Sequence, residues 1–308
     1  MHFDTLQTPV VLVVFKRPDT TRKVFEAISK ARPARLLVIG DAPREGRPEE
    51  AESCRQVREI VSRVDWPCEV SSNFSEKNLG TRDRIVSGLN WAFSLVEEAI
   101  ILEDDCLPDQ SFFPFCREML EIYRDDTRVG SICGTNLVER HLHTEDSYYF
   151  SNLGTTWGWA TWRSMWQKLD LTLGDWPRIK KDKMLSEIFD DSKAVSFWTQ
   201  HYDERYEGRG VRSWDSSWIY TLLKNNALAV IPRVNLVANI GFRPDATHTV
   251  LKDSRFTPPA KTLEFPLRHP SNFVPLRTVD RRHQDLFYLT LGQRVSRKFF
   301  KVVGKLNL

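Results

Sequence analysis

The 308-residue chain lacks the glycine-rich loops that mark the commonest nucleotide-binding folds. Neither G-x-G-x-x-G nor G-x-x-x-x-G-K-[ST] occurs, which argues against a dinucleotide-dependent oxidoreductase and a P-loop NTPase. A G-x-S-x-G turn is also missing, so nothing indicates a serine hydrolase of that type.

Cysteine is scarce and scattered. The five cysteines form no C-x-x-C pair and match no zinc-binding spacing. An odd number of dispersed cysteines indicates reduced thiols in a reducing compartment. Two of them, Cys106 and Cys133, lie in apolar runs and are predicted to be core residues.

Long apolar runs are missing as well. The most apolar early run, 10–15, is far shorter than the roughly 20 residues that cross a bilayer. Residues 1–4 lack the basic and apolar character of a signal peptide. We therefore expect a cytoplasmic protein, most simply a bacterial one.

Charge is distributed unevenly along the chain. Residues 254–308 contain eleven basic and three acidic residues, so this segment carries +8 and the remainder −5 of the net +3. In 293–308 basic and apolar residues are interleaved, so a helix there would either lie on the inner face of the membrane or pack on its own domain. We expect no nucleic-acid binding, because the basic groups are confined to this tail and no known module is present.

Apolar runs alternate with helical patterns through the first hundred residues. This alternation is typical of βαβ units. It predicts an α/β fold with a Rossmann-like, mostly parallel central sheet flanked by helices. The predicted strands cover 10–15, 36–39, 68–71 and 99–102, and the helical patterns begin at Asp19 or Thr20 and cover about 49–64 and 81–96.

Polar clusters follow three of these runs: Lys16-Arg17, Gly40-Asp41 and Glu103-Asp104-Asp105. Ligands of parallel sheets bind outside the carboxyl ends of the strands. We therefore expect the three clusters to converge on one site.

The acidic triplet 103–105 is the strongest single signal. In extended chain Glu103 and Asp105 would share one face and Asp104 the other. Acids packed this closely need a compensating cation or donor network, and their hard oxygen ligands suit Mg²⁺ or Mn²⁺. The alternative is that they cap the following helix, a role that Asp109 or Ser111 can also serve.

The second half is rich in tryptophan, with eight of the ten tryptophans between residues 148 and 218. Such density suits either an aromatic core or a wall that stacks on sugar rings. Trp157 and Trp159 flank Gly158, where backbone can approach a ligand. We predict one domain over 1–253, with a nucleotide-sugar half to about 135 and an acceptor half from 136, followed by a basic tail over 254–308.

With these features in order, the chain resembles the GT-A glycosyltransferases. It is most similar to the N-acetylglucosaminyltransferase I family and related bacterial nucleotide-diphospho-sugar transferases. The likeness spans about residues 9–250. The matching segments are Phe15-Lys16-Arg17, Gly40-Asp41, Arg82 and Arg84 in a helix containing Gly88, Ile101–Asp105, Trp157–Trp162, Trp214-Asp215, Gly241-Phe242 and Thr247-His248.

The resemblance implies a role for each strand-end residue. Arg17 and Asp41 would bind the nucleotide base and ribose, and Asp105 would hold the metal ion. Glu103 and Asp104 would contact ribose and donor sugar.

Further donor contacts are expected from four basic residues. Arg82 stands where the family has a histidine against the uracil ring, so it would stack on the base or reach a phosphate, and Arg84 would also bind the donor. Arg243 and His248 lie in a polar stretch that suits a loop closing over a diphosphate; the alternative is an ordinary surface loop.

For the transfer itself the resemblance implies Asp215 as general base, although the residue also suits the start of a helix. Its neighbour Trp214, with Trp157 and Trp159, would face donor or acceptor sugar, and the flanking tryptophans would lower the polarity around Asp215.

The expected function is a metal-dependent, inverting transfer of a sugar from a nucleotide diphosphate to a hydroxyl of a glycan or lipid-linked acceptor in polysaccharide biosynthesis. A UDP-sugar is the favoured donor, and UDP-GlcNAc is one candidate among the UDP-sugars. Two alternatives stay open. One is a non-catalytic sugar-nucleotide or carbohydrate-binding protein on the same fold. The other is a sugar-phosphate nucleotidyltransferase, although no glycine-rich loop follows the first strand.

Overall fold

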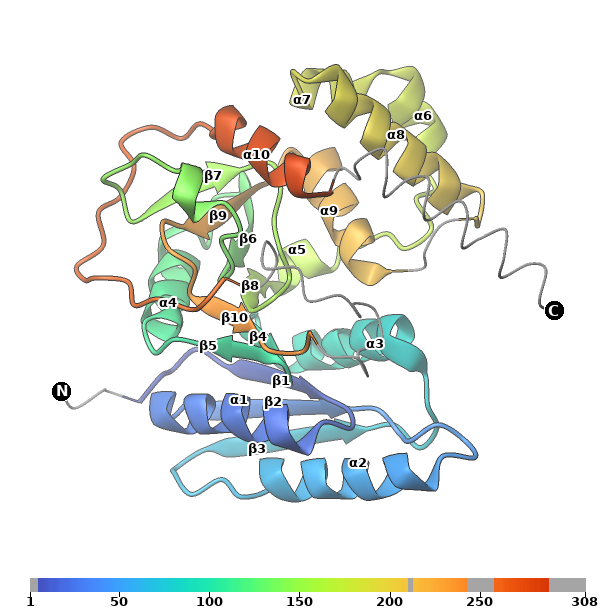
Figure 1. Ribbon diagram of the computed structural model, residues 1–308, viewed down its shortest axis with the longest axis vertical. Coiled ribbons are helices and arrows are strands. Elements are labelled where there is room, and N and C mark those ends of the chain that lie inside the picture. Colours follow the sequence, from blue (N-terminus) through green and yellow to red (C-terminus); the bar gives the residue numbers. More distant parts are fainter. Residues whose placement is uncertain (1–4, 210–212, 243–257, 288–308) are drawn as a thin grey trace.

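An eight-stranded sheet runs through the protein in the order β3-β2-β1-β4-β8-β6-β9-β7 (Figure 1). The computed structural model describes residues 5–209, 213–242 and 258–287. Strands β1 to β4 are mutually parallel, as are β6 and β9, whereas β8 and β7 run antiparallel to their neighbours. The strands are β1 (Val10–Val14), β2 (Arg35–Gly40), β3 (Glu69–Phe74), β4 (Glu98–Glu103), β6 (Val129–Cys133), β7 (Tyr148–Ser151), β8 (Trp159–Trp162) and β9 (Leu228–Pro232).

Helices connect and cover these strands, so the predicted fold class is confirmed: α/β, with a mostly parallel central sheet flanked by helices. The arrangement is consistent with the Rossmann-like GT-A fold that the resemblance implies. The helices are α1 (Pro18–Ala31), α2 (Pro48–Val61), α3 (Gly80–Leu95), α4 (Phe112–Ile122), α5 (Arg163–Trp166), α6 (Trp176–Lys181), α7 (Met184–Ile188), α8 (Ser192–Tyr206), α9 (Trp214–Lys224) and α10 (Arg277–Phe287).

The alternating side chains of β1 supply the cores on both faces of the sheet. Val10, Leu12 and Val14 belong to the core that α1, α2 and α4 cover, whereas Val11 and Val13 belong to the core under α3. All five residues of β1 are buried. A strand covered on both faces must be apolar throughout, and the run that predicted this strand is continuous for that reason.

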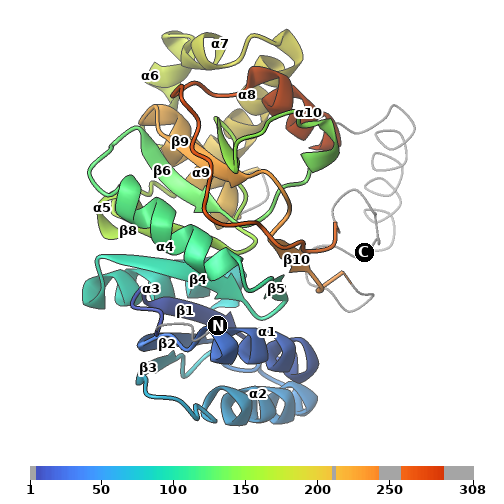
Figure 2. The same cartoon turned by 90° about the vertical axis from the view of Figure 1, so that its left-hand side faces the viewer.

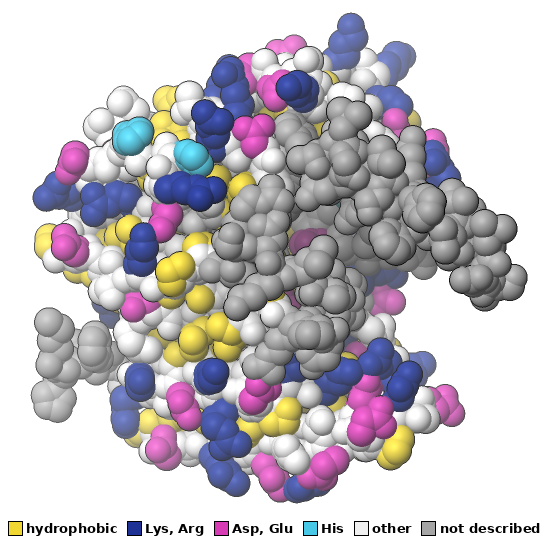
Figure 3. Space-filling view, in the orientation of Figure 1, with side chains coloured by type: hydrophobic (Ala, Val, Ile, Leu, Met, Phe, Trp, Pro, Cys, Tyr) yellow, Lys and Arg dark blue, Asp and Glu magenta, His cyan; other side chains and the backbone are white. Residues whose placement is uncertain are grey.

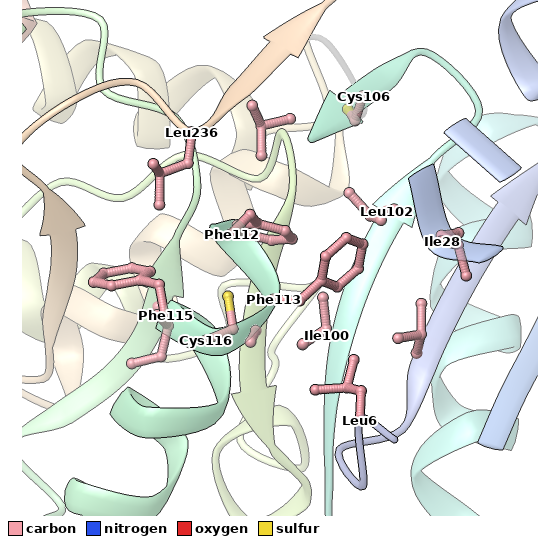
Figure 4. Packing of buried hydrophobic residues seen from close by; sticks show 14 of the residues in the cluster. Leu6, Ile28, Ile100, Leu102, Cys106, Phe112, Phe113, Phe115, Cys116 and Leu236 are labelled. Carbon is pink, nitrogen blue, oxygen red and sulfur yellow. The ribbon is translucent and has the colours of Figure 1, made fainter. Parts of the chain in front are cut away.

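On the α4 face, two phenylalanines fill the space beside β4. Phe112 and Phe113 pack with their ring centroids 5.7 Å apart, and both belong to the same buried cluster as Leu102 (Figure 4). This packing fixes α4 and the end of β4 against each other. It thereby positions the residues that follow Leu102.

Helix α1 begins at Pro18, directly after Arg17, so the predicted start at Asp19 or Thr20 is wrong by one or two residues. Proline is favoured at the first helical position, because the amide that it lacks would have no partner within the helix. The connection from β1 to α1 is therefore only three residues long, at positions 15–17.

A short two-stranded ribbon lies beside the main sheet. It pairs β5 (Cys106–Pro108) with β10 (Val237–Asn239) in antiparallel register, with Asn239 opposite Cys106. Because β5 follows the acidic triplet immediately, this pairing brings the residues after β10 next to the triplet.

Most of the tryptophans of the second half form cores. Trp159, Trp166, Trp214 and Trp218 pack together, with ring centroids 5.1 to 6.2 Å apart. A separate cluster around Trp176 holds α6, α7 and α8 together at the end of the molecule opposite α2 (Figures 1 and 2).

The part of the predicted basic tail that the structure describes, 258–287, packs on the body of the protein. Leu263, Leu267 and Val279 are buried, and α10 packs on β7. Asp280 of α10 accepts hydrogen bonds from the backbone amide (3.1 Å) and the side-chain amide (2.9 Å) of Asn152. The predicted division at 253/254 therefore does not separate this segment from the domain, and the basic segment 293–308 lies outside the described residues.

In the described ranges, no helix is both long and apolar enough to span a bilayer. On the face shown in Figure 3, basic and acidic side chains are interspersed, as on an ordinary solvated surface.

His283 of α10 gives the fold a pH dependence. Burial of the imidazole lowers the pKa of His283 from 6.5 to about 4. The unfolded chain takes up this proton near pH 6.5 and the folded protein only near pH 4, so the folded state loses stability as the pH falls between these values. Between pH 7.5 and pH 5, wild type should lose about 2 kcal/mol more unfolding free energy than His283→Gln in urea denaturation.

His141→Gln is the matched control, because His141 is exposed, and it should follow wild type. If H283Q keeps the wild-type pH dependence, the buried imidazole is not its source.

Candidate active site at the carboxyl ends of β1, β2 and β4

Three neighbouring strands end at the same edge of the sheet. Val14 of β1 is level with Gly40 of β2, and Val13 is level with Glu103 of β4. The polar residues that follow these strands are thus brought to one edge, as their positions in the sequence indicate.

The acidic triplet turns toward β1 and α1. The Asp104 carboxylate accepts a hydrogen bond from the backbone amide of Phe15 at 3.0 Å. The Asp105 carboxylate pairs with the Arg17 guanidinium, with Oδ2 and Nη1 2.5 Å apart. The side chains of Asp104 and Asp105 thus have partners other than the next helix and do not cap it. At the start of α4 the Asp109 carboxylate accepts hydrogen bonds from the amide and the hydroxyl of Ser111.

The extended-chain argument for the triplet is wrong in one respect. Strand β4 ends at Glu103, and Asp104 and Asp105 form a turn, so strand alternation does not continue through them. The turn still keeps the acids close, since Asp105 is the charged neighbour that most strongly raises the pKa of Glu103.

Among the described residues, two of the acids at this edge have raised pKa values. Burial, and then Asp105, Asp104 and Asp215, raise the pKa of Glu103 well above its usual value, and Arg17 opposes the rise. Burial and Asp105 likewise raise the pKa of Asp104 to about 7, opposed by Arg17 and the Phe15 amide. Carboxylates in this state gain stability from any additional cation.

Asp215 reaches the same site from a distant part of the chain. It lies in the first turn of α9, is exposed to solvent, and accepts a hydrogen bond from the Ser216 amide at 2.8 Å. Its charge acts on Glu103, so the structure brings the predicted base near the predicted metal-binding acids. Trp214 and Trp218 are buried in a core cluster, and the expectation that they lower the polarity around Asp215 stays a prediction.

An arginine that the sequence did not single out positions α9. Arg205 of α8 donates to the Ser213 carbonyl and the Ser217 hydroxyl, each at 2.6 Å. Burial lowers the pKa of Arg205, Asp215 opposes this shift and Arg82 adds to it, so both residues lie near Arg205. No sequence pattern links α8 to α9 in this way, because the contact is tertiary.

Asp41 is occupied by the start of α3. Its carboxylate accepts hydrogen bonds from the backbone amides of Leu79 and Gly80 at 3.0 Å, and from the Asn78 side chain at 3.1 Å. The residue is only 7% exposed. The structure therefore gives Asp41 a capping role in place of the nucleotide contact that the resemblance implied.

Arg84 is likewise used within the protein. Its guanidinium donates to the carbonyls of Gly40 (3.1 Å) and Asn73 (2.6 Å), which ties the ends of β2 and β3 to α3. Burial lowers the pKa of Arg84. The predicted contact of Arg84 with the donor is therefore not supported. Arg82, in contrast, is partly exposed, and its side chain pairs with Asp83 at 2.7 Å.

Two of the three predicted sugar-facing tryptophans are core residues. Trp159 is 1% exposed and Trp214 5%, and they pack on each other, so neither can stack on a sugar. Trp157 is partly buried, with its ring edge-on to Phe242 at 5.7 Å. The other predicted donor-binding residues, Arg243 and His248, lie outside the described residues.

The chemistry of the donor set fits a hard divalent cation. The site offers carboxylate oxygens, and its acids need positive charge. Among the described residues, no three His, Cys, Asp or Glu side chains are arranged as a complete metal site. A Mg²⁺ or Mn²⁺ ion that also binds a diphosphate commonly needs only one or two protein carboxylates, so Asp105 is a residue that could hold such an ion.

Comparison with known proteins adds little. No protein-family model and no curated protein matches the chain. A 4-diphosphocytidyl-2C-methyl-D-erythritol synthase from Anaerococcus prevotii resembles it with a TM-score of 0.32 and 7% identity, over 53% of this chain and 76% of that one. A UDP-glucose pyrophosphorylase complexed with UDP-glucose resembles it with a TM-score of 0.26 and 12% identity, over 47% and 62%. Likenesses this distant do not bear on function.

The capping role of Asp41 is testable. In Asp41→Ala the amides of Leu79 and Gly80 lose a buried acceptor, so the unfolding free energy should fall by about 2 kcal/mol in urea denaturation. Asp83→Ala removes an exposed acid from the first turn of the same helix and should cost less than about 0.5 kcal/mol. A D41A protein of unchanged stability but weakened nucleotide binding would show instead that Asp41 is a ligand.

Proposed function

We propose that this protein is a metal-dependent, inverting glycosyltransferase that moves a sugar from a nucleotide diphosphate to a hydroxyl of a glycan or lipid-linked acceptor. The observation that carries the proposal is a cluster of acids, 103–105, at the carboxyl edge of a parallel sheet, with Asp215 of a distant segment close enough for its charge to act on Glu103. Ligands bind at this edge in α/β sheets. The favoured donor is a UDP-sugar, with UDP-GlcNAc first.

The two groups of acids suit different tasks. Asp104 and Asp105 are held by Phe15 and Arg17, which is appropriate for residues that fix a ligand. Asp215 is exposed and lies on another element, which is appropriate for a residue that meets the acceptor. A Mg²⁺ or Mn²⁺ ion held by Asp105 would supply positive charge to the departing diphosphate.

Every bond, electron pair and proton of the transfer is accounted for with these residues. The acceptor oxygen forms a bond to the anomeric carbon as the bond from that carbon to the diphosphate oxygen breaks, and the electron pair leaves with the nucleoside diphosphate. Asp215 takes the proton of the acceptor hydroxyl. Attack from the face opposite the diphosphate inverts the configuration at the anomeric carbon.

A sugar-phosphate nucleotidyltransferase is the second candidate, because an acid-rich site would also suit a metal-bound nucleoside triphosphate. The connection between β1 and α1 favours it less. It contains only three residues and no glycine, and Lys16 within it pairs with Glu50 at 2.6 Å.

The products separate the candidates. Purified protein with Mn²⁺ and UDP-GlcNAc should release UDP, slowly without acceptor and faster with one, as followed by a UDP-detecting assay. Release of pyrophosphate from UTP and a sugar 1-phosphate would support the nucleotidyltransferase instead. If neither product forms with a panel of nucleotide sugars, but binding occurs, the protein is a non-catalytic binder.

Variants of the two groups of acids should fail differently. Asp215→Asn should lower kcat by about 10²- to 10⁴-fold with donor affinity within about threefold of wild type, because only proton removal is affected. Asp105→Asn should weaken Mn²⁺-dependent UDP binding at least about tenfold, as measured by calorimetry.

Asp83→Asn, at an exposed acid of α3, is the control for both variants and should behave like wild type. If D215N retains wild-type turnover, Asp215 is not the base.

A further inference from the structure

The first turn of α1 holds the backbone of Arg17, whose side chain pairs with Asp105. The Arg17 carbonyl accepts the Thr21 amide at 3.0 Å and the Thr21 hydroxyl at 2.7 Å, so the first turn of α1 fixes its backbone. The side chains of Arg17 and Asp105 are 18% and 17% exposed. A ligand can therefore reach the pair, although most of it is enclosed.

The segment that follows β10 covers the pair. The Ile240 amide donates to the Asp105 carbonyl at 2.8 Å, and the Gly241 amide donates to the Asn239 side chain at 2.9 Å. A Cβ on Gly241 would lie 2.0 Å from the Asp105 carboxylate oxygen and 2.9 Å from the Arg17 guanidinium. A side chain here would have to displace both charged groups, so the backbone of Gly241 lies directly against them.

Arg17 supplies Asp105 with a positive charge, because its Nη1 lies 2.5 Å from Asp105 Oδ2. Arg17 thus supplies to Asp105 the positive charge that a bound divalent cation would supply. A divalent cation held by Asp105 would have to compete with Arg17 for this carboxylate.

We propose that Arg17 is an internal counter-ion which a divalent cation displaces from Asp105, and that the released guanidinium then binds the diphosphate of the nucleotide. This inference rests on the proposed function, in which Asp105 holds the metal. A planar guanidinium suits both partners, because it forms paired hydrogen bonds to carboxylate and to phosphate.

The exchange couples the two ligands. A cation alone must separate Arg17 from Asp105, and the cost of breaking this ion pair weakens its binding. A nucleoside diphosphate offers Arg17 a new anionic partner, so each ligand strengthens the binding of the other by the same factor. Arg17 is therefore a positioning residue that makes cation binding depend on the nucleotide.

The test measures Mn²⁺ affinity by calorimetry with and without UDP, and needs no turnover. Arg17→Gln should bind Mn²⁺ alone at least about tenfold more tightly than wild type, because the competing cation is gone. In wild type UDP should strengthen Mn²⁺ binding both through its phosphates and by releasing Asp105 from Arg17, so the factor by which UDP strengthens Mn²⁺ binding should be at least about tenfold smaller in R17Q than in wild type. Saturating Mn²⁺ alone should raise the Tm of R17Q more than that of wild type.

Two further variants serve as controls for the Arg17→Gln experiment. Arg17→Lys keeps a cation and should bind Mn²⁺ nearly as weakly as wild type, so tighter binding in R17Q alone is assigned to charge. Arg124→Gln breaks an arginine–carboxylate pair (2.7 Å, to Glu98) at the opposite end of β4 and should match wild type.

The outcomes separate the two claims. If R17Q binds Mn²⁺ no more tightly than wild type, while D105N abolishes Mn²⁺ binding, the counter-ion role is overturned and the proposed metal site stands. If wild type, R17Q and R17K all fail to bind Mn²⁺ even with UDP present, the proposed function is overturned and the inference with it.

Discussion

The site depends on a cluster of carboxylates at the end of β4, one of which, Asp105, is paired with the guanidinium of Arg17. Burial raises the pKa of Glu103 and of Asp104 above their usual values, and Asp105 raises both further. An apolar, doubly covered sheet is a costly place for such a cluster, because buried charge must be paired. Specific partners offset this cost. The Phe15 amide donates to Asp104, the Arg17 guanidinium pairs with Asp105, and the backbone of Gly241 lies against that ion pair. A cation and a diphosphate would complete the balance.

Much of the architecture could be predicted from the sequence because it follows from periodicity. Continuous apolar runs identified β1, β2 and β4 to within about one residue at most ends, since a strand buried on both faces tolerates no polar position. The convergence of strand-end residues followed from parallel pairing alone. The same reasoning failed at Asp104 and Asp105, where a turn replaces the strand and alternation no longer applies.

Individual roles were harder to predict, because a residue type does not reveal which partner it meets in the folded chain. Asp41 and Arg84 look like donor ligands in sequence, yet the first caps α3 and the second ties two strand ends to that helix. In the sequence, Trp159 and Trp214 could equally well stack on a sugar or belong to the core, and only their packing in the folded chain shows that they are core residues. Arg205 carried no signal at all, because its contacts with the start of α9 join segments that no local pattern connects.

The central claim is that Asp105 and its neighbours bind a divalent cation together with a nucleoside diphosphate. The most direct measurement is the anomalous scattering of manganese in crystals grown with Mn²⁺ and UDP. The account predicts a peak about 2.0–2.3 Å from an Asp105 carboxylate oxygen and at a similar distance from phosphate oxygens, with Arg17 turned toward the diphosphate. Ordered UDP with no manganese at Asp105, and with the Arg17–Asp105 pair intact, would contradict it.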